Sequence, residues 1–206
     1  MKVSREQAAE NRRRIVEVAG RLFRERGFDG IGVADLMKAA GLTHGGFYGH
    51  FRSKDDLAAE ACGRVLDRSA EAWQRWLAEG GEAPLEALLD RYLSDRHRRH
   101  PGRGCLFAAL AADVARQDDP ALRHVLTEGL RPQVDRLAAV MPGDSDAARR
   151  QRALASLSAM VGALVLARAV DDPALSDEIL AATRAELAGP AQDRATIPEE
   201  GSTGPA

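Results

Sequence analysis

The chain has 206 residues, of which 45% are hydrophobic, 29% charged and 4% aromatic, and it contains two cysteines. This size allows one large domain, or a small domain and a larger one, and the cysteine content gives no reason to expect a structural disulfide. The first fourteen residues are charged and lack the apolar core of a signal peptide. The longest uncharged stretch, residues 153–167, is shorter than the ~20 residues that span a bilayer. We therefore expect a cytoplasmic protein without a membrane partner.

The net charge of −2 is distributed unevenly along the chain. Residues 1–54 contain eleven Lys or Arg and six Asp or Glu, a balance of +5, and the remaining residues have a balance of −7. A basic head on an acidic body is the electrostatic footprint of a protein that presents one end to nucleic acid.

Three short helices are predicted in the basic head. The first ends at Gly27, and the second, residues 33–40, ends at Gly41, which accepts the left-handed conformation of a helix C-cap. Thr43 is placed to cap a third helix, residues 43–51, through its hydroxyl. A helix, a tight turn and a capped short helix make a helix-turn-helix, whose second helix enters the major groove of DNA.

The third predicted helix contains Gly45, Gly46 and Gly49, although each glycine costs roughly 1 kcal/mol of helix propensity relative to alanine. A helix that must lie close to a phosphate backbone or groove wall has a reason to carry glycines, because they remove the side chain that would hold it off. The alternative is an irregular loop. Phe47 and Phe51, one turn apart, favour a docked helix.

This segment resembles the DNA-binding domain of TetR-family transcriptional regulators over about the first quarter of the chain. One departure is Gly32, because the family usually has Ser or Thr there, capping the second helix and touching phosphate. The matching residues are Ile15, Ala19, Phe23, Gly27, Phe28, Val33, Ala40, Gly41, Thr43, Gly45, Tyr48, His50, Phe51, Ser53, Lys54 and Leu57.

Beyond residue 54 the pattern predicts a helical bundle. Helices are expected over residues 54–79, 84–98, 105–116, 120–140, 145–170 and 173–188, with Asp-Pro pairs starting two of them. The predicted fold is all-α: a three-helix DNA-binding head (residues 1–53) and a larger effector-binding and dimerisation bundle (residues 54–188), about nine helices in total. Residues 189–206 have little to bury and are expected to be disordered.

The helix at 145–170 is apolar enough to be either the centre of a domain or a face covered by a partner. The resemblance favours the second reading, because TetR-like regulators dimerise through their last two long helices. The expected homodimer interface contains Leu154, Leu157, Val161, Gly162 and Val165.

The expected DNA contacts lie on the third helix and just after it. We expect His44 to reach a base edge, and His50 and Lys54 to meet phosphates, with the helix N-terminus at Lys54 adding to the attraction. The complete predicted set is Thr43, His44, Gly45, Gly46, Tyr48, His50 and Lys54.

The C-terminal region is similar to a TetR subgroup in which a GC motif opens the sixth helix, and some members of that group sense electrophiles or oxidants through this cysteine, here Cys105. A helix N-terminus and Arg103 nearby are expected to lower the pKa of this thiol. The alternative is that Cys105 is a small apolar residue that packs the start of a helix. Cys62 is expected to be a core residue.

Two other ligand readings concern the body. His97, His100 and Cys105 have the spacing of a metal site, but without a fourth ligand a polar helix end is the preferred interpretation, and no metal is predicted. The aromatic residues Trp73, Trp76, Tyr92 and Phe107 either line a small-molecule cavity or fill the core.

These observations predict a non-enzymatic, sequence-specific DNA-binding regulator that needs no cofactor. It is expected to be a repressor, released from a palindromic double-stranded operator by a small-molecule or electrophile effector. The alternatives are a DNA-binding regulator without an effector and a helical-bundle enzyme, although no catalytic constellation is evident. The helix at 54–79 is expected to be the only long element joining head and body.

Overall fold

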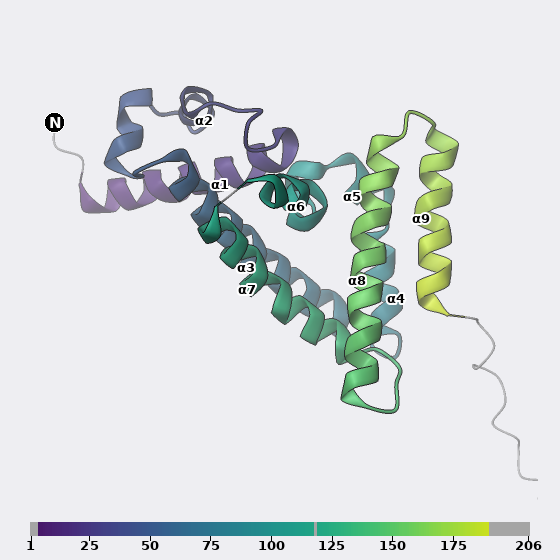
Figure 1. The fold of residues 1–206 in the computed structure, drawn as a ribbon. Helices are drawn as coiled ribbons and strands as arrows, with labels where there is room; N and C mark the ends of the chain where they lie inside the picture. The colour runs from purple at the N-terminus through teal and green to yellow at the C-terminus, as the bar shows by residue number, and fades with distance from the viewer. Residues whose placement is uncertain (1–3, 118, 190–206) are drawn as a thin grey trace, which may run out of the picture.

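The computed structural model describes residues 4–117 and 119–189, which form helices and no strand. The head consists of α1 (Arg5–Arg26), α2 (Val33–Ala39) and the 3-10 helix η1 (His44–Gly49). The prediction of an all-α protein with about nine helices is confirmed for this part of the chain (Figure 1). The body contains α3 (Lys54–Glu79), α4 (Pro84–Tyr92), α5 (Asp95–Arg99), the 3-10 helix η2 (Pro101–Arg103), α6 (Leu106–Arg116), α7 (Pro120–Ala138), α8 (Asp146–Ala169) and α9 (Pro173–Ala188).

The expected Asp-Pro starts are present. The carboxylates of Asp119 and Asp172 each accept a hydrogen bond of 2.8 Å from the backbone N–H two residues later, at the starts of α7 and α9. The single helix predicted over residues 84–98 was wrong. It is divided into α4 and α5, because Leu93 leaves the helical conformation and the Ser94 hydroxyl caps the next helix by accepting from the N–H of His97.

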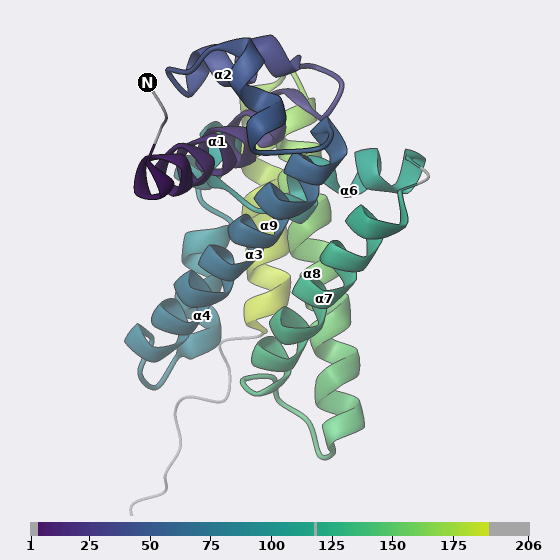
Figure 2. The same cartoon turned by 90° about the vertical axis from the view of Figure 1, so that its left-hand side faces the viewer.

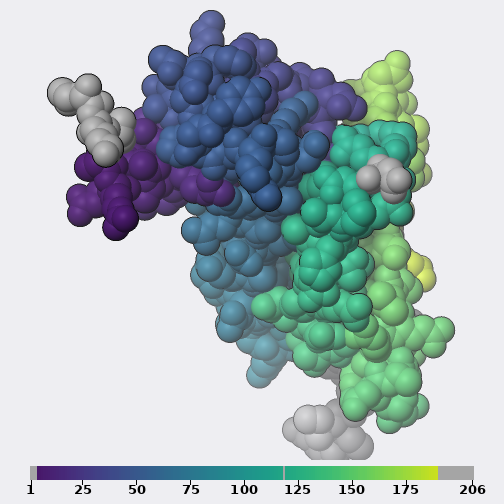
Figure 3. All heavy atoms as spheres, turned by 60° about the vertical axis from the view of Figure 1, so that its left-hand side comes forward, coloured from purple at the N-terminus to yellow at the C-terminus, as the bar shows by residue number. Residues whose placement is uncertain are grey.

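The helix α3 leaves the head and runs down the body, where it contacts α4, α6 and α7. In both ribbon views α7 lies along α3 (Figures 1 and 2). The helices α8 and α9 pack side by side, on the side of the molecule opposite the start of α1 (Figure 1). The helix α8 also contacts α6 and α7. In the space-filling view the first turns of α1 project sideways beyond the body (Figure 3).

The helix α8 is long and apolar enough, by length and composition, to cross a membrane, with a mean hydropathy of 1.4 in its most apolar window. Core helices of soluble proteins pass the same test, and α8 buries Met160 and Leu164 completely against its neighbours. Only 39% of that window is buried within the protomer, however, so part of its apolar surface is left open.

The predicted disordered tail, apart from Gly189, lies outside the described residues. The predicted boundary between head and body falls at Ser53, whose hydroxyl caps α3 by accepting from the N–H of Asp56 at 3.0 Å.

Candidate nucleic-acid interface

The turn of the helix-turn-helix is built by Gly41, as predicted. Its φ of 70° lies in the left-handed region, which is open to glycine at no steric cost. Two backbone bonds close the turn: Gly41 N–H donates to the carbonyl of Lys38 at 3.0 Å, and Leu42 N–H donates to that of Met37 at 2.9 Å. This pattern is the Schellman motif, which satisfies the last carbonyls of α2 and reverses the chain toward η1.

Residues 43–50, which follow the turn, form the recognition segment. It was predicted to be an α-helix capped by the Thr43 hydroxyl, and both details were wrong. The structure has a 3-10 helix, and Thr43 stands at its N-cap without a side-chain hydrogen bond. At six residues this 3-10 helix is longer than most, because runs of this geometry rarely exceed three or four residues.

Two phenylalanines anchor the recognition segment. Phe47 and Phe51 are 1% and 2% exposed, and their ring centroids lie 5.6 Å apart in the core of the head. The docked arrangement is therefore confirmed, and the irregular-loop alternative is excluded. Between these anchors Tyr48 points outward and is 69% exposed.

The predicted DNA contacts form one exposed strip. Thr43, His44, Gly45, Gly46 and Tyr48 are all exposed, whereas His50 and Lys54 are half-buried. The ring of His44 lies edge-on to that of Tyr48, with centroids 6.4 Å apart. The strip is therefore continuous and free of covering side chains.

The glycines of the strip are not required by the protomer. A Cβ at Gly45 or Gly49 would meet nothing within 4 Å, and at Gly46 it would make only ordinary contacts of 3.6 and 3.7 Å. None of the three has a positive φ, so the backbone would accept other residues. The protomer therefore leaves open space over the backbone at Gly45 and Gly49.

The start of α3 is less favourable for an anion than expected. The Ser53 hydroxyl already accepts from the Asp56 N–H, and the carboxylates of Asp55 and Asp56 lie in the first turn. Arg52 pairs with Asp56 at 2.8 Å and, through that hydrogen bond, lowers the pKa of the carboxyl. A phosphate at this point therefore depends on the Lys54 side chain more than on the helix end.

In the body, Cys105 is the N-cap of α6 and is 7% exposed, so it is buried. The predicted neighbour Arg103 is exposed. Two cations, Arg24 and Arg168, interact with Cys105: burial lowers the pKa of both guanidinium groups, that of Arg24 to about 10, and the interaction with Cys105 opposes this shift. Sequence reasoning missed these two residues because they come from α1 and α8.

His97 is part of the same cluster and not of a solvated helix end, which corrects the preferred interpretation of this stretch. Its Nδ1 lies 2.6 Å from the carbonyl of Tyr92, and its Nε2 accepts from the Cys105 N–H at 2.9 Å. Burial lowers the pKa of His97 to about 4, so the ring is neutral. Both ring nitrogens are occupied, and the described residues contain no group of three potential metal ligands.

Arg24 provides a second connection between head and body, besides α3. From the last turns of α1 its guanidinium donates to the carbonyls of Gly102 and Gly104, at 2.6 and 2.7 Å. These residues directly precede Cys105 and α6. Among the described elements α3 is the long helix that runs from the head into the body, as expected, and Arg24 adds a side-chain connection to it.

The four aromatic residues, which were expected either to line a cavity or to fill the core, divide between these two roles. Trp73 and Tyr92 are 2% and 1% exposed and pack edge to face in the core, with centroids 6.0 Å apart. Trp76 lies partly buried under the Arg91 guanidinium. Phe107 instead helps to line an apolar hollow of about 360 Å³ between α6, α7 and α8, together with Leu130, Leu154, Leu157, Ser158, Val161 and Gly162. Cys62 is a core residue 1% exposed, as expected, and burial raises its pKa to about 12.

The predicted dimer residues divide into two groups. Leu154 and Val165 are 44% and 42% exposed, and Val161 and Gly162 are half-buried beside them. Leu157, at 4% exposed, belongs to the protomer core, so its place on the interface was wrong. Two further leucines are exposed on the last two helices, Leu166 on α8 and Leu175 on α9, at 57% and 42%.

Comparison with known proteins agrees with this geometry. The family model described as "Bacterial regulatory proteins, tetR family" matches residues 15–61, which cover most of α1, α2, the recognition segment and the start of α3. Residues 15–61 therefore belong to the DNA-binding domain of the TetR family of transcriptional regulators. The sequence prediction of this family is confirmed.

Individual relatives match parts of the chain. The HTH-type transcriptional repressor DhaR of Mycobacterium sp. strain GP1 is 30% identical over 118 residues, which cover 56% of this chain and 58% of DhaR. The HTH-type transcriptional regulator AcrR of Shigella flexneri is 40% identical over 57 residues, 28% of this chain and 26% of AcrR. The matched segments therefore cover 58% of the length of DhaR and 26% of the length of AcrR.

The fold is also found in solved structures. The crystal structure of reduced Escherichia coli NemR superposes with a TM-score of 0.71 at 22% identity, covering 86% of this chain and 95% of NemR. At this identity the likeness concerns the fold alone.

Proposed function

We propose that this protein is a homodimeric repressor that binds a palindromic operator through its recognition segment and leaves it when an effector binds the body. The observation that carries the DNA-binding part is the exposed strip of the recognition segment. It lies on a basic head, is anchored from behind by Phe47 and Phe51, and is open around Gly45 and Gly49. A backbone free of side chains can approach a groove wall closely, and His44 and Tyr48 supply side chains for base edges.

The dimer is supported by the open face of α8 and α9. This face exposes four apolar side chains: Leu154, Val165, Leu166 and Leu175. In a two-fold dimer each copy would bury these side chains of the other. One recognition segment touches few bases, so two of them on a palindrome roughly double the contact free energy.

The effector is proposed to occupy the apolar hollow beside Phe107. This hollow shares Leu154, Val161 and Gly162 with the proposed dimer face, so in the dimer it would lie against the second copy. Its walls are apolar except for Ser158, whose hydroxyl already donates to the carbonyl of Leu154 at 2.8 Å. An uncharged apolar molecule fits such a lining. Phe107 belongs to the first turn of α6, and the preceding glycines are held by Arg24 of α1, so a shift of α6 is transmitted to the head.

Release requires only a modest change. Half-sites repeat at one helical turn, about 34–36 Å, or at multiples of it, so a shift of a few ångströms between the recognition segments prevents simultaneous contact. The effector must bind the released state more tightly than the DNA-bound state, with a coupling of ~1–3 kcal/mol.

A fluorescence anisotropy titration with the intergenic DNA upstream of the gene tests the proposal. We expect binding that weakens with salt and is much tighter than to scrambled DNA of equal length. Lys54→Ala is expected to lower the salt slope by about one per half-site. Equal affinity for both DNAs contradicts a sequence-specific repressor, and an unchanged slope contradicts the phosphate contact of Lys54.

The effector part is tested by adding apolar compounds, N-ethylmaleimide or hydrogen peroxide to the protein–DNA complex. We expect an apolar compound to release the DNA and to change the fluorescence of Trp73 or Trp76. Cys105→Ser is expected to bind DNA normally. If this variant also responds to both reagents as the wild type does, sensing through Cys105 is excluded, and if no compound acts, the protein is a regulator without an effector.

A further inference from the structure

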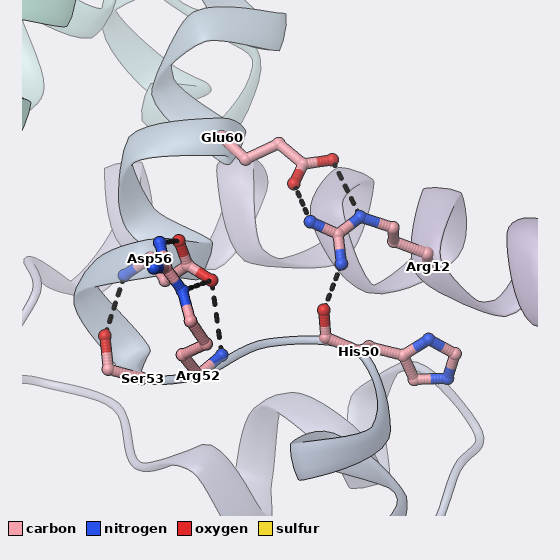
Figure 4. Close-up of polar contacts among 6 residues, drawn as sticks. All are labelled: Arg12, His50, Arg52, Ser53, Asp56 and Glu60. Carbon is pink, nitrogen blue, oxygen red and sulfur yellow. Dashed lines mark hydrogen bonds and ion pairs between the residues drawn. The ribbon is translucent and has the colours of Figure 1, made fainter.

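Arg12 belongs to the basic run at residues 12–14, which in a DNA-binding head suggests a phosphate contact. Its surroundings indicate a different role (Figure 4). The side chain is 40% exposed, and its guanidinium extends from α1 to α3 and to the end of the recognition segment, where residues of both hold it.

Glu60 of α3 takes two of the donors. Arg12 Nη2 lies 2.5 Å and Nε 3.3 Å from the two carboxylate oxygens, a side-by-side arrangement that fixes the plane of the guanidinium. The remaining amino group, Nη1, donates to the carbonyl of His50. His50 is the residue at which η1 ends, so this bond holds the end of the recognition segment.

The ring of Phe51 completes the site. The Arg12 guanidinium carbon lies 4.2 Å from the ring centroid, within the range of a cation–π contact. Phe51 is one of the two anchors of the recognition segment, so Arg12 is tied to this segment both through its backbone and through its aromatic anchor.

We propose that Arg12 is a positioning residue that sets the orientation of the recognition segment relative to α3, and that it is not a phosphate contact. This inference rests on the proposed DNA-binding function. Because Glu60 lies on α3, a tilt of α3 in the body moves Glu60, and Arg12 carries that movement to His50.

The chain contains a matched control for the link that Arg12 makes between α1 and α3. Arg68 of α3 pairs with Glu17 of α1 at 3.0 Å, so it also links these two helices, but the bond lies away from the recognition segment. Arg12→Gln and Arg68→Gln each remove one α1–α3 ion pair and one positive charge. Only the first removes the bond to His50.

The test compares both variants as full-length protein on the upstream DNA site that the wild type protects, at several salt concentrations. For Arg12→Gln we expect at least tenfold weaker specific binding with an unchanged salt slope and unchanged affinity for scrambled DNA. Arg68→Gln is expected to bind as the wild type does. A slope lowered by about one per half-site identifies Arg12 as a phosphate contact and overturns the proposal, as does unaltered binding.

A second measurement needs no DNA. Amide hydrogen exchange of residues 43–51 in the free protein is expected to be faster in Arg12→Gln than in the wild type, and unchanged in Arg68→Gln. Equal exchange in all three proteins overturns the positioning role. If the wild type recognises no DNA site while exchange changes as expected, the proposed DNA-binding function is wrong, but the positioning role of Arg12 is supported. Arg12→Lys, which keeps the charge but not the paired geometry, replaces Arg12→Gln if that variant does not fold.

Discussion

Two faces of the protomer are left uncovered, and their chemistry is opposite. The recognition segment is short, polar and rich in glycine, with Tyr48 as its one large exposed apolar side chain. The face of α8 presents Leu154, Val165 and Leu166. Each face contains a glycine at which an added Cβ atom would have no neighbour within 4 Å: Gly45 on the recognition segment and Gly162 on α8.

Open space at a glycine does not by itself identify a partner, because Gly63 on α3 has it too. The neighbouring side chains make the distinction. Around Gly45 they are polar and the region is basic, which suits DNA, whereas around Gly162 they are apolar, which suits a second copy of the chain. We therefore expect the same small residue to permit close approach to two different molecules.

The largest expected effect comes from charging the α8 face. Gly162→Glu is expected to give monomers and to abolish operator binding, because a carboxylate cannot be buried unpaired in an apolar interface. The protomer has room for the side chain, so its fold is expected to persist. Size-exclusion chromatography, circular dichroism and DNA titration measure these properties, with Gly63→Glu as the control that remains dimeric. A dimeric Gly162→Glu protein would place the interface elsewhere.

Filling the space at Gly45 tests the other face alone. Gly45→Leu is expected to weaken operator binding at least tenfold, because the side chain holds the backbone away from the groove. The dimer should persist, and the free energy of unfolding should stay equal or rise by about 0.4–1 kcal/mol, since the native φ suits other residues. Unchanged DNA affinity would contradict close approach at this position. Chromatography and urea unfolding of the same variant serve as its controls.

The buried cluster around His97 contrasts with both faces and responds to pH. Its pKa in the folded protein is about 4, below the ordinary value of 6.5, so the unfolded chain binds the proton more readily between these values. Stability is therefore full above pH 6.5 and lost as pH falls toward 4. From pH 7 to pH 5 we expect His97 to account for a loss of about 2 kcal/mol in the free energy of unfolding.

Urea unfolding at both pH values measures this loss. In His97→Gln the decrease between pH 7 and pH 5 is expected to be smaller by that amount, whereas the exposed histidine variant His124→Gln should follow the wild type. Parallel pH dependence in all three proteins would show that His97 is protonated equally in both states.

The smallest expected effect is a gain at Gly32, the N-cap of α2, which has no side-chain cap. Its φ of −87° and ψ of 160° suit serine, and a Cβ there would meet nothing. Gly32→Ser is expected to raise the free energy of unfolding by a few tenths of a kcal/mol. If this end of α2 faces a phosphate, as the family resemblance implies, DNA affinity should also rise severalfold. Weaker binding by a stable variant would exclude that orientation.

The sequence predicted the elements whose cause is local. Gly41 permits the left-handed turn, Phe47 and Phe51 recur one turn apart, and the Asp-Pro pairs start α7 and α9, so these features followed from residue type and spacing. The start of α5 was missed, although Ser94 followed by Asp95 was a readable capping signal.

Contacts between distant segments were decided only by the tertiary structure. Arg24 and Arg168 meet beside Cys105 from α1 and α8, and Arg12 reaches Glu60 and the His50 carbonyl across 48 and 38 residues of chain. Burial also separated residues that the pattern had grouped, sending Leu157 inward and leaving Leu154 and Val165 exposed on the same helix. Helix and turn preferences act over a few residues and can be read from the sequence, whereas the partner of a long side chain depends on how whole helices pack.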